Sequence, residues 1–318
     1  MNYVVFDLEW NQCPYGKEQE NPALPFEIIE IGAVKLDDER QIVDTFHRII
    51  RPVVYKHLHH RTREVVGITE EELKDGIPFS VGLREFLKFA GGECMFCTWG
   101  PGDLTELQRN MKYYGLLSLL KGPIHFYDVQ KLFAIQYETM KSRRALEYAA
   151  DYLSISKDQN FHQALSDARY TAQIFQTLDM DVVLAYDSID VYQNPKSKRD
   201  EIHAVYNGYT KFISREFNTR EEAMHDREVS STHCCLCGRT ARKKMRWFSA
   251  GGKNYYCVAY CPEHGYLKGK ARMKHTDEGK IFVVKTIRVS CEEEAGEIRE
   301  KKENLRKKRL QKKNSETT

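Results

Sequence analysis

The chain of 318 residues lacks any continuous apolar run of the roughly 18 residues that a membrane-spanning helix requires. It also lacks a charged leader at its start, since the strand-like segment 3–10 follows almost at once. These two absences argue against membrane insertion and export. They predict a soluble protein.

The nine cysteines lack the dispersed pattern of a disulfide framework, because five of them lie between Cys234 and Cys261. Such clustering favours metal ligation in a reducing compartment. We therefore expect a cytoplasmic protein.

The net charge of +3 conceals two halves of opposite sign. Residues 1–190 hold 20 basic and 29 acidic residues, whereas residues 191–318 hold 29 basic and 17 acidic residues. This asymmetry indicates that the first half carries cation-dependent chemistry and that the second half binds a polyanion. Ordinary variation in surface charge is the alternative explanation.

The order of predicted elements indicates an α/β domain. Strand patterns cover residues 3–10, 27–36 and 42–51, and helices and strands then alternate from residue 69 onward. Three meander strands followed by this alternation predict a mixed sheet flanked by helices.

Composition divides the chain into four segments. The apolar pattern thins between about Asp187 and Val229, cysteines and aromatic residues gather beyond residue 230, and Glu, Lys and Arg dominate from Cys291 onward. We predict a first domain at 1–182, a connector with a short helix at 183–229, a small β domain at 230–290 and a charged tail at 291–318.

Acidic residues recur at positions where a strand or a helix begins or ends. Asp7 and Glu9 lie two apart on a strand and therefore project from one face. Asp103 follows a strand at the start of a helix, where it could be a ligand or only a helix cap. His162 and Asp167 would point about 140° apart on one helix, so they converge only if His162 lies on the entering loop. A solvent-facing histidine beside an acidic first turn is the alternative.

These five residues, in this order and spacing, resemble the three motifs of the DEDDh exonucleases, a family that includes RNase T and the DNA polymerase III proofreading subunit. The resemblance covers roughly residues 1–182 and implies an RNase H-like fold with 3′-to-5′ exonuclease activity. Residues 27–32 and 145–150 resemble the branch of histone-mRNA-type 3′ exonucleases and bacterial KapD-like proteins, which favours RNA over DNA.

Two metal ions follow from the charge of such a site. Four carboxylates held together repel one another, and two divalent cations about 4 Å apart convert this repulsion into ligation. Hard oxygen ligands favour Mg²⁺ or Mn²⁺. The resemblance implies that Asp7 bridges both ions, and that Glu9 and Asp167 complete one site. Asp103 would bind directly or through water.

The resemblance also implies the remaining chemistry. His162 is suited to accept the proton of the attacking water, because imidazole titrates near neutral pH. The products would be nucleoside 5′-monophosphates released from a single strand. Leu8 and Trp10 flank the two acids, and either side chain could stack on the terminal base. A role in the core is the alternative for both.

Cysteine and histidine spacing predicts a second metal site. Cys234-x2-Cys237 and Cys261-x2-His264 form two knuckle-like pairs, which indicate one structural zinc ion in a zinc-ribbon-like β domain. Cys235 and Cys257 are rival ligands, and thiols without a metal are the alternative.

Basic and aromatic residues are interspersed around this cluster, as in segments 242–248 and 268–272. This composition suits a single-stranded nucleic acid, because phosphates bind cations and unpaired bases stack on rings. A ribbon docked on the first domain with an inert basic face is the alternative.

Two other functions compete with the exonuclease. The same fold could bind nucleic acid or a protein as a regulator without hydrolysis, although all five motif residues are present. A purely structural zinc-ribbon adaptor would leave residues 1–182 unexplained.

Overall fold

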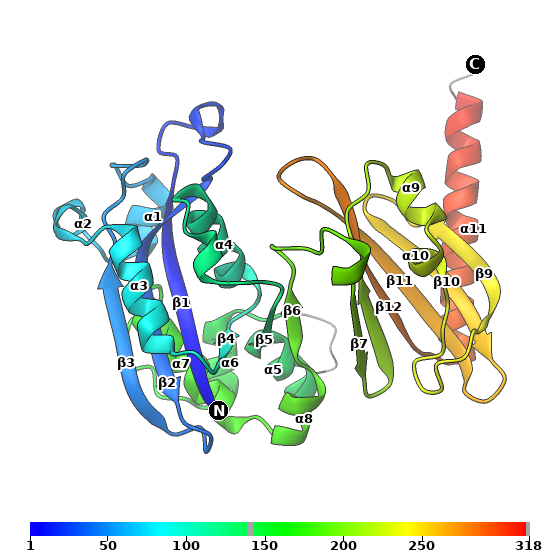
Figure 1. The fold of residues 1–318 in the computed structure, drawn as a ribbon, viewed down its shortest axis with the longest axis horizontal. Helices are drawn as coiled ribbons and strands as arrows, with labels where there is room; N and C mark the ends of the chain where they lie inside the picture. Colours follow the sequence, from blue (N-terminus) through cyan, green and yellow to red (C-terminus); the bar gives the residue numbers. More distant parts are fainter. Residues whose placement is uncertain (139–142, 316–318) are drawn as a thin grey trace. The chain divides into compact units, whose positions relative to one another are not determined.

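A computed structural model describes residues 1–138 and 143–315 of the chain. The polypeptide forms two compact units, Met1–Gln193 and Asn194–Thr318 (Figure 1). None of the described helices is long and apolar enough to cross a membrane.

The first unit is built on a six-stranded mixed sheet with the strand order β3-β2-β1-β4-β5-β6. Strand β1 pairs antiparallel with β2 and parallel with β4. The outer pairs β2–β3 and β5–β6 are antiparallel, and β4–β5 is parallel. The strands are β1 (Asn2–Gln12), β2 (Phe26–Leu36), β3 (Ile42–Ile49), β4 (Cys94–Thr98), β5 (Ile124–Asp128) and β6 (Ser188–Asp190). The predicted α/β fold with a mixed sheet is confirmed.

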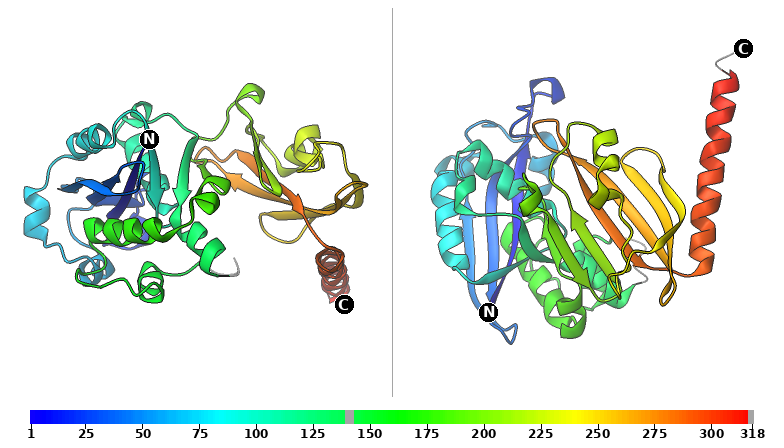
Figure 2. Two further views of the ribbon diagram at one scale, coloured as in Figure 1. Left: turned by 90° about the horizontal axis from the view of Figure 1, so that it is seen from below. Right: turned by 45° about the vertical axis from the view of Figure 1, so that its right-hand side comes forward.

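Helices cover both faces of this sheet (Figures 1 and 2). Helices α1 (His60–Val65) and α2 (Glu70–Asp75) follow β3, and Thr69 opens α2 with a capping box to Glu72. The others are α3 (Phe79–Ala90), α4 (Gly102–Tyr113), α5 (Val129–Tyr137), α6 (Leu146–Tyr152), α7 (Ala164–Thr177) and α8 (Met180–Ala185). Short 3₁₀ turns lie at Lys17–Gln19 and Leu117–Leu119.

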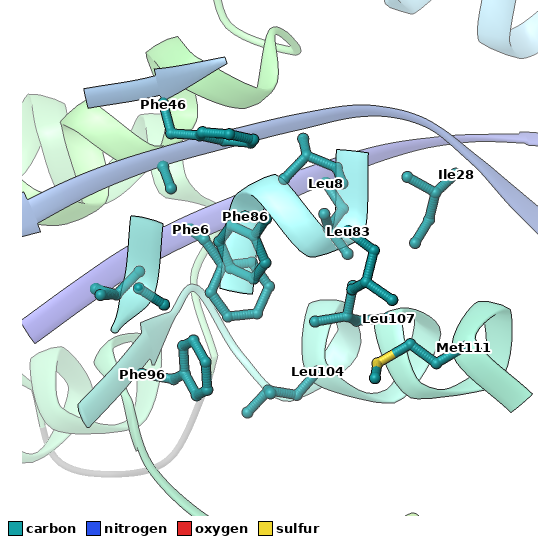
Figure 3. Packing of buried hydrophobic residues seen from close by; sticks show 14 of the residues in the cluster. Phe6, Leu8, Ile28, Phe46, Leu83, Phe86, Phe96, Leu104, Leu107 and Met111 are labelled. Carbon is teal, nitrogen blue, oxygen red and sulfur yellow. The ribbon is translucent and has the colours of Figure 1, made fainter. Parts of the chain in front are cut away.

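Alternation along β1 separates two cores. Val4, Phe6 and Leu8 pack against α3 and α4 in one cluster, as Figure 3 shows for Phe6 and Leu8. Tyr3 and Val5 pack in the other cluster with residues of α7. Burial of each large apolar side chain contributes roughly 1.5–3 kcal/mol. By the same alternation, Asp7 and Glu9 face the α7 side of the sheet.

The second unit is a six-stranded antiparallel sheet with the strand order β7-β8-β12-β11-β10-β9. Its strands are β7 (Ile202–Tyr206), β8 (Tyr209–Ile213), β9 (Arg242–Ser249), β10 (Asn254–Cys261), β11 (Gly265–His275) and β12 (Ile281–Val289). A 3₁₀ turn, Lys198–Asp200, and helices α9 (Arg220–His225), α10 (Arg227–Ser230) and α11 (Glu292–Ser315) complete the unit.

The predicted connector at 183–229 is wrong as a separate segment. Strand β6 belongs to the first sheet, and β7 and β8 belong to the second. The short helix expected within 183–229 is present as α9, which Thr219 caps. The zinc-ribbon-like region 230–290 is therefore part of a larger sheet. The charged tail forms α11, whose Ala295 and Ile298 are buried against Val258.

Candidate active site and metal centre

Two acidic side chains of the site come from the central strand. Asp7 and Glu9 pair with Gly32 and Glu30 of β2, and the register shifts immediately after Glu9. Both side chains are partly buried. The strand geometry therefore places two carboxylates together at the α7 face.

Asp103 comes to this strand from the start of α4. It is 6% exposed, and its Oδ1 accepts a hydrogen bond from the backbone N–H of Leu8 at 3.3 Å. A simple cap of its own helix would not make this contact. This hydrogen bond thus ties Asp103 to β1 at Leu8, the residue between Asp7 and Glu9.

His162 and Asp167 converge as predicted, because the histidine precedes α7 and the aspartate lies in its first turn. His162 has a backbone φ of 62°, a strained value for a residue with a side chain, and its N–H donates to Asp167 Oδ2 at 3.2 Å. Ligand atoms of Glu9, His162 and Asp167 all lie within 4.8 Å of one another.

Burial and repulsion from neighbouring carboxylates raise the pKa values of all four carboxyl groups. Burial, then the charges of Asp103 and Glu9, raise the pKa of Asp7 well above its ordinary value. Burial and the charge of Asp167 raise the pKa of Glu9 to about 8. Burial also raises the pKa of Asp103 to about 7 and that of Asp167 to about 6. Full ionisation of the cluster is therefore costly without cations.

The residues fit divalent metal ions. Asp167 Oδ1 is buried and has no hydrogen-bond partner within the described part of the chain. A buried carboxylate oxygen without a partner is costly unless a cation binds it. The donors are hard oxygen atoms, which Mg²⁺ and Mn²⁺ prefer.

Two residues of β2 hold α7 in place, and neither was predicted as a site residue. Glu30 is 4% exposed, contacts His47 Nε2 through Oε1 at 2.7 Å, and accepts the N–H of Ala164 through Oε2 at 3.2 Å. A Cβ atom on Gly32 would lie 2.1 Å from the backbone nitrogen of Leu165. Glycine therefore permits the close approach that brings α7 to Asp7.

The two predicted base contacts differ in their placement. Leu8 is 3% exposed and lies in the core, so its side chain offers almost no surface to a base, and the stacking prediction is wrong for this residue. Trp10 is partly exposed and packs near Phe26, with ring centroids 5.9 Å apart. Trp10 remains a predicted substrate contact.

The second metal centre brings together Cys234, Cys237, Cys261 and His264, whose ligand atoms lie within 4.8 Å of one another. The Sγ atoms of Cys237 and Cys261 are 3.7 Å apart, and His264 Nδ1 is 3.6 Å from Cys261 Sγ. Sulfur atoms at 2.3 Å from a tetrahedral zinc ion are about 3.8 Å apart. The donor set and its spacing fit zinc.

The rival cysteines lie elsewhere. Cys235 Sγ contacts the carbonyl oxygen of Gly208 at 3.3 Å, and burial raises the pKa of Cys257 to about 12. Burial opposes ionisation of Cys261, but hydrogen bonds from the His264 side chain and nearby backbone groups outweigh it and lower the pKa to about 6. Cys261 is thus suited to bind metal as a thiolate.

The fold and the first site define a nuclease of the DEDDh class. Residues 4–175 match the RNase T model of the exonuclease family, and the chain belongs to this family of 3′-5′ exonucleases. The family match ends before the second unit begins. The family resemblance of the three motifs is thereby confirmed.

The first unit is similar to several known proteins and to a solved structure. The chain is 27% identical over 183 residues to the probable 3′-5′ exonuclease KapD of Bacillus subtilis, covering 56% of this chain and 84% of KapD. It is 33% identical over 150 residues to the PolC-type DNA polymerase III of Thermotoga petrophila, covering 47% of this chain but 10% of that protein. The nuclease domain of 3′hExo bound to rAMP, a DEDDh family member, is 21% identical and covers 59% of this chain and 96% of that chain, with a TM-score of 0.49.

Proposed function

We propose that this exonuclease degrades single-stranded nucleic acid, RNA in preference to DNA, and releases nucleoside 5′-monophosphates. The observation that carries the proposal is the meeting of Glu9, His162 and Asp167 beside Asp7 and the anchored Asp103. Such a site combines cation ligands with a group that can move a proton.

Asp7, Glu9, Asp103 and Asp167 would hold two Mg²⁺ or Mn²⁺ ions. When bound, such ions lower the pKa of the attacking water and stabilise the leaving 3′ oxygen. His162 would take the proton of that water, and its exposed imidazole is accessible for this task. The hydrogen bond from its backbone to Asp167 keeps the base beside the carboxylates.

Positioning falls to the surrounding residues. Glu27 accepts hydrogen bonds from the N–H groups of Val53, Val54 and Tyr55, and Asn11 donates to the carbonyl oxygen of Tyr55 at 3.0 Å. These contacts fix residues 53–55 against β1 and β2. Trp10, on the same strand, would stack on the terminal base.

The preference for RNA is supported by relatives of this chain that are named as exoribonucleases. ERI1 exoribonuclease 2 of mouse is 26% identical over 198 residues, and 3′-5′ exoribonuclease 1 of mouse is 25% identical over 167 residues.

We also propose that one structural zinc ion is bound by Cys234, Cys237, Cys261 and His264. All four donors are protein groups, so the site leaves no open position for a substrate or a water molecule.

Competition between two strands tests the substrate. RNA and DNA of equal sequence carry different 5′ labels and are mixed with the protein in Mg²⁺ or Mn²⁺. We expect the RNA to shorten faster and nucleoside 5′-monophosphates to accumulate. Faster loss of the DNA would overturn the RNA preference, and nucleoside 3′-monophosphates would overturn the chemistry. If neither strand shortens although both bind, a non-hydrolytic binding module replaces the enzyme.

A further inference from the structure

The strands of the second sheet carry charge of only one sign. Strands β7 to β12 contain eleven lysine and arginine residues and no aspartate or glutamate. Like charges gathered on one sheet repel one another, and a partner of opposite charge relieves this repulsion. The metal ligands and the base assigned to the exonuclease centre include none of them.

Most of these cations project from one face. Along β11, Leu267, Gly269, Ala271 and Met273 are buried, and the residues between them are Lys268, Lys270, Arg272 and Lys274. Alternate residues of a strand point to opposite faces, so the four cations form a row about 20 Å long. The buried face packs under α9 and α10 through Ala223 and Val229.

The register extends this row across neighbouring strands. Lys268 and Lys270 lie opposite Arg288 and Thr286 of β12, and Thr286 lies opposite Lys211 of β8. Side chains directly opposite one another share a face. We call this surface, defined by Lys211, Lys268, Lys270, Arg272 and Arg288, the basic sheet face.

Aromatic rings lie on the same face. Tyr209 is opposite Arg288, and it stacks on Tyr206 with ring centroids 4.4 Å apart and an interplanar angle of 10°. Tyr256 is opposite Lys270, and Tyr260 is opposite Tyr266. All five tyrosines are partly exposed.

Helix α11 neutralises only part of the basic sheet face. Glu294 pairs with Lys268 at 2.7 Å and also with Arg288. Lys270 and Arg272 are exposed and form no ion pair with any residue that the structure describes. These two cations are therefore available to an external anion.

We infer that the basic sheet face binds the phosphates and bases of a single-stranded nucleic acid. Cations in a row match a chain of phosphates, and partly exposed rings offer stacking surfaces that only unpaired bases can use. A protein partner with acidic residues would satisfy the cations but would leave the rings without this role. The inference rests on the proposed function for its ligand, and it assigns to the second unit the grip on substrate beyond the cleaved end.

Binding is measured separately from hydrolysis. The Asp7→Asn protein is titrated into 5′-fluorescein-labelled 20-nucleotide RNA, and anisotropy is recorded between 50 and 300 mM KCl. The buffer holds no added Mg²⁺ or Mn²⁺ and no chelator, so that zinc is retained. In this background, Lys270→Glu/Arg272→Glu is compared with Arg220→Glu/Arg227→Glu. The control changes the same net charge on α9 and α10, which cover the opposite face.

We expect the Lys270/Arg272 double variant to bind at least tenfold more weakly at 100 mM KCl, and the control to bind within threefold of its parent. The slope of log affinity against log salt should fall by about 1.4, since each phosphate contact on a single strand contributes about 0.7. The neutral variant Lys270→Gln/Arg272→Gln should show a smaller loss. Equal affinity of Lys270→Glu/Arg272→Glu and its control would overturn the inference. Equal competition by heparin, which has negative charge but no bases, and by poly(U), which has both, would overturn it as well.

Hydrolysis distinguishes this inference from the proposed function. For hydrolysis, Lys270→Glu/Arg272→Glu is made in the protein that keeps its native Asp7. This double variant should cleave a trinucleotide at the wild-type rate but show a raised KM for the 20-nucleotide strand. If the double variant binds RNA more weakly but the protein with native Lys270 and Arg272 hydrolyses neither substrate, the proposed function is wrong and the inference about the basic sheet face stands. If that protein hydrolyses both substrates and the double variant has unchanged KM values, the inference is wrong and the proposed function stands.

Discussion

Replacing Glu9 by glutamine should stabilise the protein in the absence of Mg²⁺ and Mn²⁺ while removing a metal ligand. Burial and the charge of Asp167 raise the pKa of Glu9 from 4.5 to about 8. The folded state therefore binds a proton between these pH values that the unfolded state has released. Stability from this group is complete below pH 4.5 and is lost as the pH rises through 8.

The magnitude follows from the size of this shift. Each pKa unit corresponds to 1.36 kcal/mol, so full ionisation of Glu9 would cost at most about 5 kcal/mol. Water entering the cleft and protonation of neighbouring carboxyl groups reduce this cost. We expect Glu9→Gln to be about 1–3 kcal/mol more stable than wild type at pH 9, and equal to it within about 0.5 kcal/mol at pH 4.5.

Urea unfolding at pH 4.5, 7 and 9 measures this difference in buffer without Mg²⁺, Mn²⁺ or chelator. Glu39→Gln is the matched control, because Glu39 is exposed in the turn between β2 and β3. Addition of Mg²⁺ should stabilise wild type more than Glu9→Gln, since it stabilises whatever state binds it. A variant that is less stable than wild type at pH 9 would refute the reasoning that ionisation of Glu9 destabilises the folded protein.

Two further substitutions test the two metal centres, one substitution for each centre. Gly32→Ala would place Cβ 2.1 Å from the Leu165 nitrogen, so we expect destabilisation by roughly 1–3 kcal/mol and at least tenfold lower kcat, whereas Gly92→Ala, with no atom within 4 Å, should change neither. An unchanged kcat in Gly32→Ala would contradict the role of close packing in placing Asp167. Cys237→Ser should lose about one zinc ion per chain by elemental analysis, and Cys291→Ser, at an exposed thiol outside the cluster, should retain it. Equal zinc content in the two variants would rule out the assigned ligands.

Local signals predicted the parts of the site that depend on short-range geometry. The two-residue spacing fixes Asp7 and Glu9 on one face of a strand. Side chains five residues apart on a helix point about 140° apart, so His162 can meet Asp167 only from a loop that precedes the helix. Both features are determined by the strand and helix periods alone. The capping box at Thr69 is local in the same sense.

Contacts between distant segments left little local trace. Glu30 and Gly32 lie in a strand pattern, and only the approach of α7 reveals why one is charged and the other small. Leu8 flanks two site residues, yet alternation turns its side chain into the core.

The segment predicted as a connector, 183–229, contains a sequence pattern that indicates a β-hairpin. Asn207-Gly208 between two short strands is a strong indicator of a β-hairpin, and it joins β7 to β8. Strand β6 has three residues, too few for a periodic pattern to emerge. In the tail, Ala295 and Ile298 stand three apart among charged residues, a spacing that marks the buried side of α11.

The most direct test of the central claim is the metal-dependent shortening of a 5′-labelled single-stranded RNA by wild type, Asp7→Asn and Asp38→Asn. Asp38 is exposed in the turn between β2 and β3 and serves as the matched control. We predict that wild type and Asp38→Asn yield, only when Mg²⁺ or Mn²⁺ is added, a ladder that shrinks from the 3′ end, and that Asp7→Asn loses at least a hundredfold in rate. Wild-type activity in Asp7→Asn, or the immediate appearance of short labelled fragments without a ladder, would contradict an exonuclease built on these carboxylates.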